Sequence, residues 1–98
     1  MLFAVIYTAR DLSEDQEKRS LTLFTNWKPP SGYEFKAHYA FADGSGGVGI
    51  IEARSAAALL EAHAPWVTFF DFKTLPLVEV TESTPILQKV LKWRDSIR

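Results

Sequence analysis

The chain has 98 residues, 47% of them hydrophobic and 13% aromatic, with 11 basic and 12 acidic side chains and no cysteine. This length predicts one domain spanning residues 1–98, and a charge near zero argues against nucleic acid as a partner. The lack of cysteine excludes disulfides and thiolate metal sites. No stretch approaches the ~20 apolar residues of a membrane span, so we expect a cytoplasmic protein with no membrane partner.

The first part of the chain predicts a strand and a helix. Residues 2–8 are apolar on both alternating faces, which is typical of a central strand and not of a signal peptide. Ser13, with Gln16 three residues later, forms a capping box, so we expect a helix from there to about Trp27. The stripe of this helix that we expect to be buried comes late, at Leu21, Phe24 and Trp27, with Leu23 beside it.

In residues 33–42, largely aromatic positions alternate with more polar ones, as in a half-buried strand. The glycine-rich residues 43–47 predict a hairpin turn into an antiparallel strand at 48–53. This loop lacks both the lysine and the strand–loop–helix context of a phosphate-binding loop. In the strand over residues 33–42, one predicted face is apolar and holds Tyr33, Phe35, Ala37, Tyr39 and Phe41. The other predicted face is polar and holds Glu34, Lys36 and His38.

The second half of the chain predicts a helix, an edge strand and a last helix. Ser55 caps a helix over residues 56–64. Residues 67–80 are rich in β-branched and aromatic side chains and predict the last strand, which should lie at a sheet edge because Pro76 cannot donate to a ladder. Thr84, followed by proline, is expected to start a C-terminal helix with a broad apolar stripe.

This order predicts an α+β fold, a ferredoxin-like βαββαβ sandwich with a C-terminal helix added. Right-handed crossovers place two helices on one face of a four-stranded antiparallel sheet with strand order 4-1-3-2. The strands are apolar on both faces, so the second face needs a cover. Either the C-terminal helix or a second subunit can supply it. We favour a homodimer in which two sheets pair, with the last helix extending the interface.

Four segments of the chain resemble a bacterial family of domains of unknown function, about a hundred residues long. The resemblance covers about residues 1–80 and includes the same apolar first strand. The members of this family are placed in the dimeric α+β barrel superfamily. The segments are residues 38–47 (HYAFADGSGG), 49–53 (GIIEA), 64–66 (APW) and 72–78 (FKTLPLV).

The resemblance implies a homodimer whose two sheets face each other, with a pocket in each monomer between the sheet and the helices. The superfamily contains cofactor-free monooxygenases, haem-degrading enzymes, lactone isomerases and effector domains of transcription regulators. The family itself carries no established activity, and a shared fold does not decide function. The resemblance therefore implies an architecture and no reaction.

Two histidines are candidates for a general base or for orienting a ligand, since histidine titrates near ~6.5. His38 lies in a predicted strand, where the simpler interpretation is a partly exposed histidine at the sheet edge. His63 lies at a predicted helix end, where the simpler interpretation is a hydrogen bond to a free carbonyl. No carboxylate lies at metal-ligand spacing from either residue, so we expect no metal and no cofactor.

Three aromatic residues complete the set of candidate binding residues. Tyr7 and Tyr39 carry hydroxyls on otherwise apolar strands, and these groups can donate to a ligand carbonyl or to each other across the sheet. Trp66 follows a proline at a helix–strand junction and is either a pocket wall or a core anchor. Two acids, Asp71 and Glu52, interrupt apolar runs, and we expect each to be ion-paired or solvated.

The expected function is binding of a small hydrophobic or aromatic metabolite in a pocket lined by Tyr7, His38, Tyr39, His63 and Trp66, with cofactor-free chemistry as an option. Surplus aromatic surface with a few interspersed polar groups favours this hypothesis. The alternative is a non-enzymatic module whose apolar second face serves only dimerisation or a partner protein. The sequence assigns neither a reaction nor a substrate.

Overall fold

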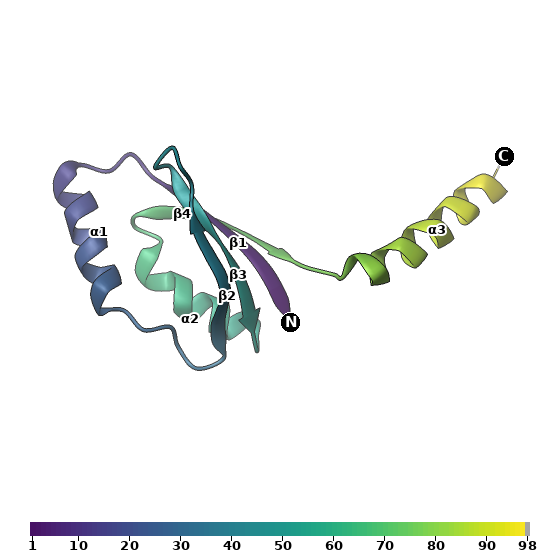
Figure 1. Ribbon diagram of the computed structural model, residues 1–98, viewed down its shortest axis with the longest axis horizontal. Helices are drawn as coiled ribbons and strands as arrows, with labels where there is room; N and C mark the ends of the chain where they lie inside the picture. The colour runs from purple at the N-terminus through teal and green to yellow at the C-terminus, as the bar shows by residue number, and fades with distance from the viewer. Residues whose placement is uncertain (98) are drawn as a thin grey trace.

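The computed structural model describes residues 1–97 and has the predicted α+β architecture, consistent with a ferredoxin-like fold (Figure 1). A four-stranded antiparallel sheet carries two helices on one face, and a third helix follows the last strand. The elements are β1 (Leu2–Ala9), α1 (Glu14–Asn26), β2 (Tyr33–Ala40), β3 (Gly46–Ala53), α2 (Ala56–His63), β4 (Phe70–Pro76) and α3 (Val80–Ser96).

The strand order is β2-β3-β1-β4, which confirms the predicted order. β1 lies in the centre and pairs antiparallel with β3 on one side and with β4 on the other. β4 lies at an edge, as its proline requires, and Pro76 is the last residue of the strand, opposite Phe3. The predicted caps of the first two helices, Ser13 and Ser55, are also confirmed. The Ser13 hydroxyl accepts from the Gln16 N–H at 3.2 Å, and the Gln16 side chain accepts from the Ser13 N–H at 2.9 Å.

The last strand is shorter than the predicted span of 67–80. Residues Ala64–Trp66 form a 3₁₀ turn, η1, and the Phe69 N–H donates to the Trp66 carbonyl at 2.9 Å. Trp66 and Phe69 are both buried. Aromatic residues are common both in strands and in buried turns, so composition alone could not show that residues 67–69 precede the strand.

The expected start of the last helix at Thr84 is wrong. α3 begins at Val80, the Thr84 hydroxyl donates to the Val80 carbonyl at 3.0 Å, and Pro85 lies inside the helix. α3 contains no buried residue and leads away from the sheet (Figure 1). The radius of gyration is 17.7 Å, against about 13 Å for a compact chain of this length, because α3 lies outside the rest of the fold.

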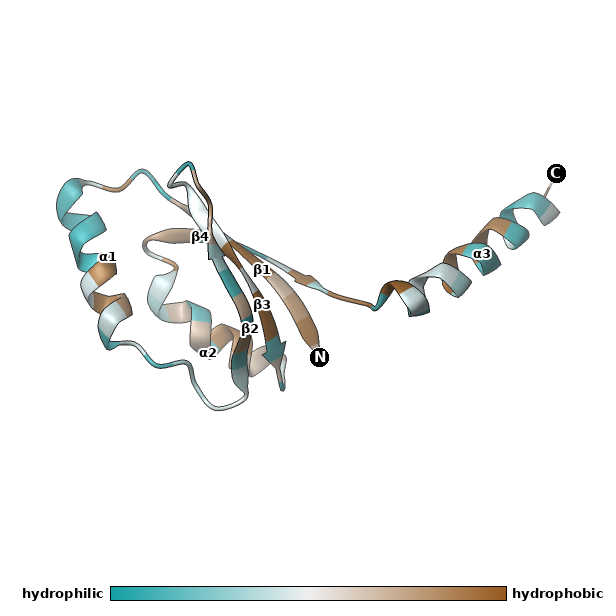
Figure 2. Ribbon diagram, in the orientation of Figure 1, coloured by the Kyte–Doolittle hydropathy of each residue, from teal (hydrophilic) through white to brown (hydrophobic). Residues whose placement is uncertain are grey.

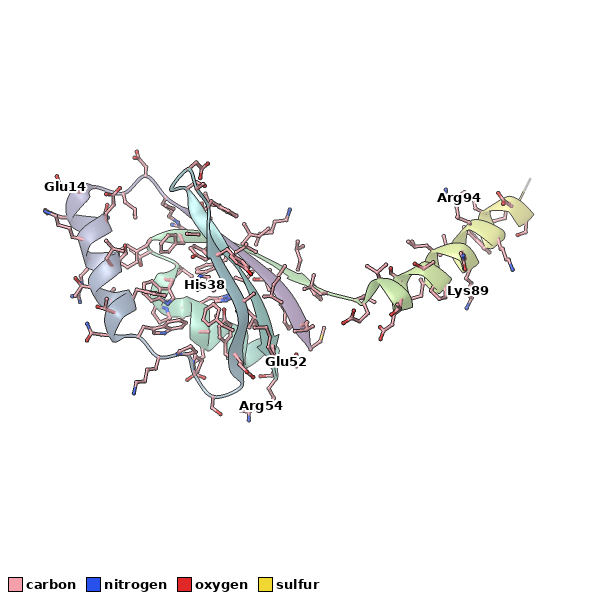
Figure 3. The ribbon with its side chains drawn as sticks, viewed as in Figure 1. Glu14, His38, Glu52, Arg54, Lys89 and Arg94 are labelled. Atoms are coloured by element: carbon pink, nitrogen blue, oxygen red, sulfur yellow. The ribbon has the colours of Figure 1, made fainter. Side chains whose placement is uncertain are left out.

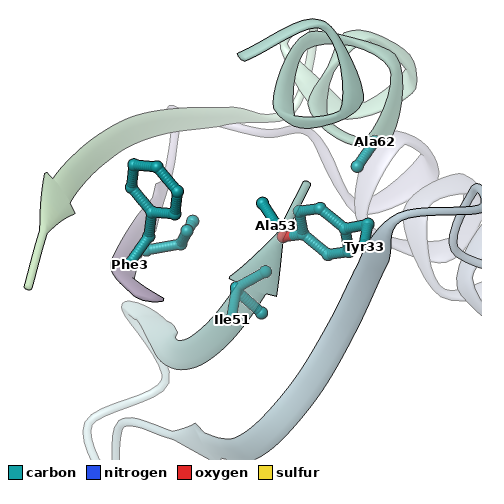
Figure 4. Close-up of a cluster of buried hydrophobic side chains, with 6 residues drawn as sticks. Phe3, Tyr33, Ile51, Ala53 and Ala62 are labelled. Carbon is teal, nitrogen blue, oxygen red and sulfur yellow. The ribbon is translucent and has the colours of Figure 1, made fainter. Parts of the chain in front are cut away.

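The core lies between the sheet and α2 (Figure 4). Ile51 on β3 is completely buried at 0% exposure. Small residues on α2 and β3 allow the helix to approach the sheet closely. The buried cluster consists of Phe3, Val5, Tyr33, Ile51, Ala53 and Ala62.

The opposite face of the sheet has no covering element among residues 1–97. The strand register places Ala4 between Ile50 and Leu75, and Ile6 beside Val48. These side chains are half-buried or exposed and form an apolar strip across β3, β1 and β4. Figure 2 shows hydrophobic residues along β1 and β3. The expected second apolar face therefore exists, and the chain's own last helix does not cover it. None of the described helices is long and apolar enough to cross a membrane.

Truncation of the buried β3 side chain tests where the core lies. We expect Ile51→Ala to lower the free energy of unfolding by about 2–5 kcal/mol, because it removes buried methyl groups and leaves a cavity. The matched control is Leu60→Ala on α2, where the side chain is 70% exposed and the loss should be about 0.5 kcal/mol. Urea unfolding followed by circular dichroism measures both, and equal losses would contradict this core.

Candidate functional site

A β-bulge in β2 decides which residues face the helices. The pairing of β2 with β3 shifts register between Phe35 and Ala37. Beyond the bulge, His38 lies on the same side as Phe35, and the two rings stack with centroids 4.6 Å apart. Figure 3 shows His38 on the side of the sheet that faces the helices. The expected placement of His38 with Glu34 and Lys36 is therefore wrong. An extra residue in one strand reverses the alternation that follows it.

The bulge also moves Tyr39 to the opposite face of the sheet. Tyr39 pairs with Val48 on the uncovered face and is 65% exposed. Its expected place beside Phe35 on the apolar face is wrong, and so is a hydrogen bond with Tyr7 across the sheet. Tyr7 bonds His38 instead.

Two tyrosine–histidine pairs lie on the helix-covered side of the sheet. The Tyr7 hydroxyl and His38 Nε2 share a hydrogen bond of 2.8 Å, which is exposed to solvent. The Tyr33 hydroxyl and His63 Nε2 share one of 2.9 Å, which is partly buried. His63 therefore bonds a phenol, and not the helix-end carbonyl that the simpler interpretation proposed.

The two pairs are joined into a closed ring of six aromatic side chains. Phe35 stacks on His38 and meets Tyr33 edge to face at 5.5 Å. Phe72 stacks on His63 at 4.5 Å and lies 6.4 Å from Tyr7. The order Tyr–His–Phe thus occurs twice around the ring, and each side chain restricts the rotamers of its neighbours. The ring consists of Tyr7, His38, Phe35, Tyr33, His63 and Phe72.

Burial keeps the polar members of this ring uncharged. Desolvation raises the pKa of Tyr7 and raises the pKa of Tyr33 to about 12. Desolvation also lowers the pKa of both His38 and His63 below the usual 6.5. At neutral pH the four groups are therefore two phenols and two neutral imidazoles. They can donate and accept hydrogen bonds but carry no charge.

A pocket of about 510 Å³ lies between this side of the sheet and the helices. Phe24 of α1 and Trp27, the residue that follows the helix, form one wall, and Trp27 meets Trp66 edge to face at 5.5 Å. α1 stands apart from the strands (Figure 1), so the predicted buried residues Leu21 and Phe24 are exposed toward this space. Among residues 1–97, no lysine, arginine, aspartate or glutamate lines the pocket.

Four of the five candidate residues line this pocket. Tyr7, His38, His63 and Trp66 do so, and Tyr39 does not. Trp66 is 7% exposed, so it anchors the helix–strand junction and is also part of the pocket wall. Tyr33, Phe35, Phe70 and Phe72 also line the pocket, although they were not predicted as site residues. Alternation along a predicted strand does not distinguish a pocket wall from the core.

Two glycines of β3 make room for the aromatic ring. A Cβ added at Gly47 would lie 2.6 Å from both Tyr7 Cζ and the Tyr39 carbonyl oxygen. A Cβ at Gly49 would lie 3.1 Å from a carbon of the Phe35 ring. The Gly47 contact is closer than real Cβ atoms approach other groups, so the Tyr7 ring occupies space that only glycine leaves free. These glycines are the sequence signal for the ring that the hairpin interpretation overlooked.

The two acids that interrupt apolar runs are paired outside the pocket. Asp71 accepts from Arg10 Nε at 3.1 Å on the surface. Glu52 accepts from the amino group of Met1. This confirms the expected paired or solvated state of both acids. Among residues 1–97, no group of three potential metal-ligating side chains comes together.

Comparison with known proteins places this architecture in a family. Residues 1–91 match the model of DUF3303, a domain of unknown function. The chain belongs to the DUF3303 family. The match extends beyond β4 into α3, so the projecting helix is part of the DUF3303 domain for most of its length. No curated protein matches the chain.

The lowered histidine pKa values make the stability of this DUF3303 domain depend on pH. Below about pH 6.5 the unfolded chain binds protons that folded His63 resists, so the free energy of unfolding should fall as the pH drops from about 7 toward 5. In His63→Gln this contribution is absent and the pH dependence should be shallower by up to about 1.4 kcal/mol per pH unit.

Urea unfolding at a series of pH values measures this difference. The carboxylates titrate equally in both proteins and cancel in the comparison. Identical pH profiles for the native protein and His63→Gln would show that His63 is not desolvated on folding.

Proposed function

We propose that this protein binds a small, uncharged, aromatic or hydrophobic molecule in the pocket between the sheet and the helices. The observation that carries the proposal is the pocket itself, which has a volume of about 510 Å³. It is lined by aromatic rings, and no charged side chain of the described residues 1–97 belongs to the lining. This volume lies within the range of about 300–1,000 Å³ that small-molecule sites occupy. A few polar groups, above all the two tyrosine–histidine pairs, can orient such a ligand.

The absence of charge from the lining favours an uncharged ligand. A carboxylate or ammonium group that enters this pocket loses its hydration and meets no opposite charge. Both histidines are neutral at neutral pH, because burial lowers their pKa values. Exposed rings such as Phe24 offer a ligand flat surfaces on which to stack.

Binding of a neutral fluorophore tests the pocket. Phenylnaphthylamine should bind and brighten, because it enters an apolar site, and its sulfonated, anionic analogue should bind at least about tenfold more weakly. Ala40→Phe places a large ring in the pocket lining and should abolish the signal. Fluorescence titration with the purified protein measures each affinity.

The matched control for this experiment is Leu60→Phe, which adds a ring on the exposed side of α2, outside the pocket lining. It should bind phenylnaphthylamine like the native protein. If Ala40→Phe retains full binding, or if the anionic analogue binds equally well, the pocket is not the site and the interaction-module alternative gains support.

A second proposal concerns the uncovered face of the sheet and follows from a separate observation. We infer that two chains pair through this face as a homodimer, as the resemblance to bacterial dimeric α+β barrel proteins suggests, with a cytoplasmic location. The supporting observation is the apolar strip that includes Ile6, Val48 and Ile50, which no described element covers. A self-complementary face of this kind suits two-fold pairing.

The projecting helix supports the same assembly. The spacing of Ile86, Val90 and Trp93 places them on one side of α3, and all three are exposed. An apolar stripe on a helix that has no buried residue needs another surface to cover it. In the proposed dimer α3 packs against the second chain and enlarges the interface.

A charge on the uncovered face should prevent this assembly. The native protein should behave as a dimer at micromolar concentration, and Ile50→Glu should be a folded monomer, because the carboxylate would be buried unpaired. The control is Leu60→Glu on the helix-covered side, which should remain dimeric. Light scattering gives the masses, and a monodisperse native monomer would contradict the proposal.

A further inference from the structure

The two tyrosine–histidine pairs differ in how much of their hydrogen-bonding capacity remains available. Tyr33 is 7% exposed and belongs to the buried core cluster, and its bond to His63 is partly buried. Tyr7 is only half-buried, and its bond to His38 is exposed to solvent. The Tyr33–His63 pair therefore belongs to the framework of the pocket, whereas the Tyr7–His38 pair is accessible from the pocket.

The Tyr7 hydroxyl keeps at least one hydrogen-bonding position free of His38 in either tautomer of that histidine. If Tyr7 donates to Nε2, its oxygen can still accept a hydrogen bond. If Nε2 carries the proton and donates to Tyr7, the phenolic O–H can still donate. A ligand hydroxyl both donates and accepts, so it satisfies Tyr7 in either arrangement. A ligand carbonyl only accepts, so it bonds Tyr7 only when the phenolic O–H is free to donate. An ether oxygen accepts that hydrogen bond weakly.

The position of the Tyr7 hydroxyl is well defined. Its ring lies over Gly47 and meets Phe70 edge to face at 5.3 Å. Its partner His38 is held by stacking on Phe35. A polar group held by packing on both sides presents a fixed point of recognition, which selects ligands more sharply than a mobile side chain does.

The other uncharged polar side chains of the pocket are less suited to bind a hydroxyl. The Ser20 hydroxyl already donates to the Glu17 carbonyl at 2.8 Å and is buried. Indole N–H groups, such as that of Trp66, donate and cannot accept. The accessible Tyr7–His38 pair is thus the site in the lining that can both donate and accept.

We propose that the ligand of this pocket is a planar, uncharged aromatic molecule bearing a hydroxyl group, and that this hydroxyl bonds the Tyr7–His38 pair. The aromatic body of the ligand stacks among the rings of the pocket, and the hydroxyl fixes its orientation. The inference rests on the pocket proposed above as a small-molecule site. It adds the polar group of the ligand and the residue that recognises it.

The test compares two probes that differ in a single group, naphthol and its methyl ether, methoxynaphthalene. Both are flat and uncharged at neutral pH. The native protein should bind naphthol about 2- to 10-fold more tightly than the ether, which is the range expected for one net hydrogen bond. Isothermal titration calorimetry, or quenching of the fluorescence of Trp27 and Trp66, measures both affinities.

Two variants with the same chemical change, Tyr7→Phe and Tyr33→Phe, show which tyrosine recognises the hydroxyl of the ligand. Tyr7→Phe keeps the ring and its packing but removes the hydroxyl, so naphthol and the ether should bind equally, with the affinity for the ether unchanged. Tyr33→Phe removes the buried hydroxyl and should lower stability, yet the preference for naphthol should persist. The ratio of the two affinities does not respond to a general loosening of the pocket.

The outcomes separate this inference from the proposal on which it rests. Equal binding of both probes by the native protein, or a naphthol preference that survives in Tyr7→Phe, overturns the hydroxyl recognition and leaves the pocket intact. A preference lost in Tyr33→Phe and kept in Tyr7→Phe assigns recognition to the buried pair and overturns this inference. If the native protein binds neither probe, both proposals fail together.

Discussion

The irregularity of β2 between Phe35 and Ala37 is the constraint on which the site depends. Without the extra residue, strict alternation would turn His38 toward the uncovered face and Tyr39 toward the helices. The bulge reverses both, and it places an imidazole within hydrogen-bonding distance of Tyr7. Bulges are often found beside functional sites because they redirect one side chain while the rest of the sheet keeps its register.

The ring of aromatic residues explains how an apolar pocket contains four polar side chains without charge. Each hydroxyl is satisfied by an imidazole, and each imidazole is stacked on a phenylalanine. Hydrogen bonding removes most of the cost of burying these groups, and desolvation holds them neutral. The result is a lining that can direct a ligand but does not attract ions.

The high hydrophobic content of the chain is divided between two surfaces. One part lines the pocket on the helix-covered side of the sheet, where the chain's own helices enclose it. The other part forms the apolar strip on the opposite face and the stripe on α3, and no element among residues 1–97 covers either of them. A small domain has too little interior to bury both, so ligand binding and self-association are complementary explanations of the same composition.

The sequence alone determined the elements with strong local signals, namely the capped helices, the glycine hairpin and the edge position of the strand ending in Pro76. These depend on hydrogen bonds and backbone preferences within a few residues. Only the tertiary structure decided the face of His38 and Tyr39, the pairing of Tyr33 with His63, and the separation of α3 from the sheet. A bulge leaves no reliable mark on periodicity, and residues about thirty positions apart meet only when the strands and helices pack.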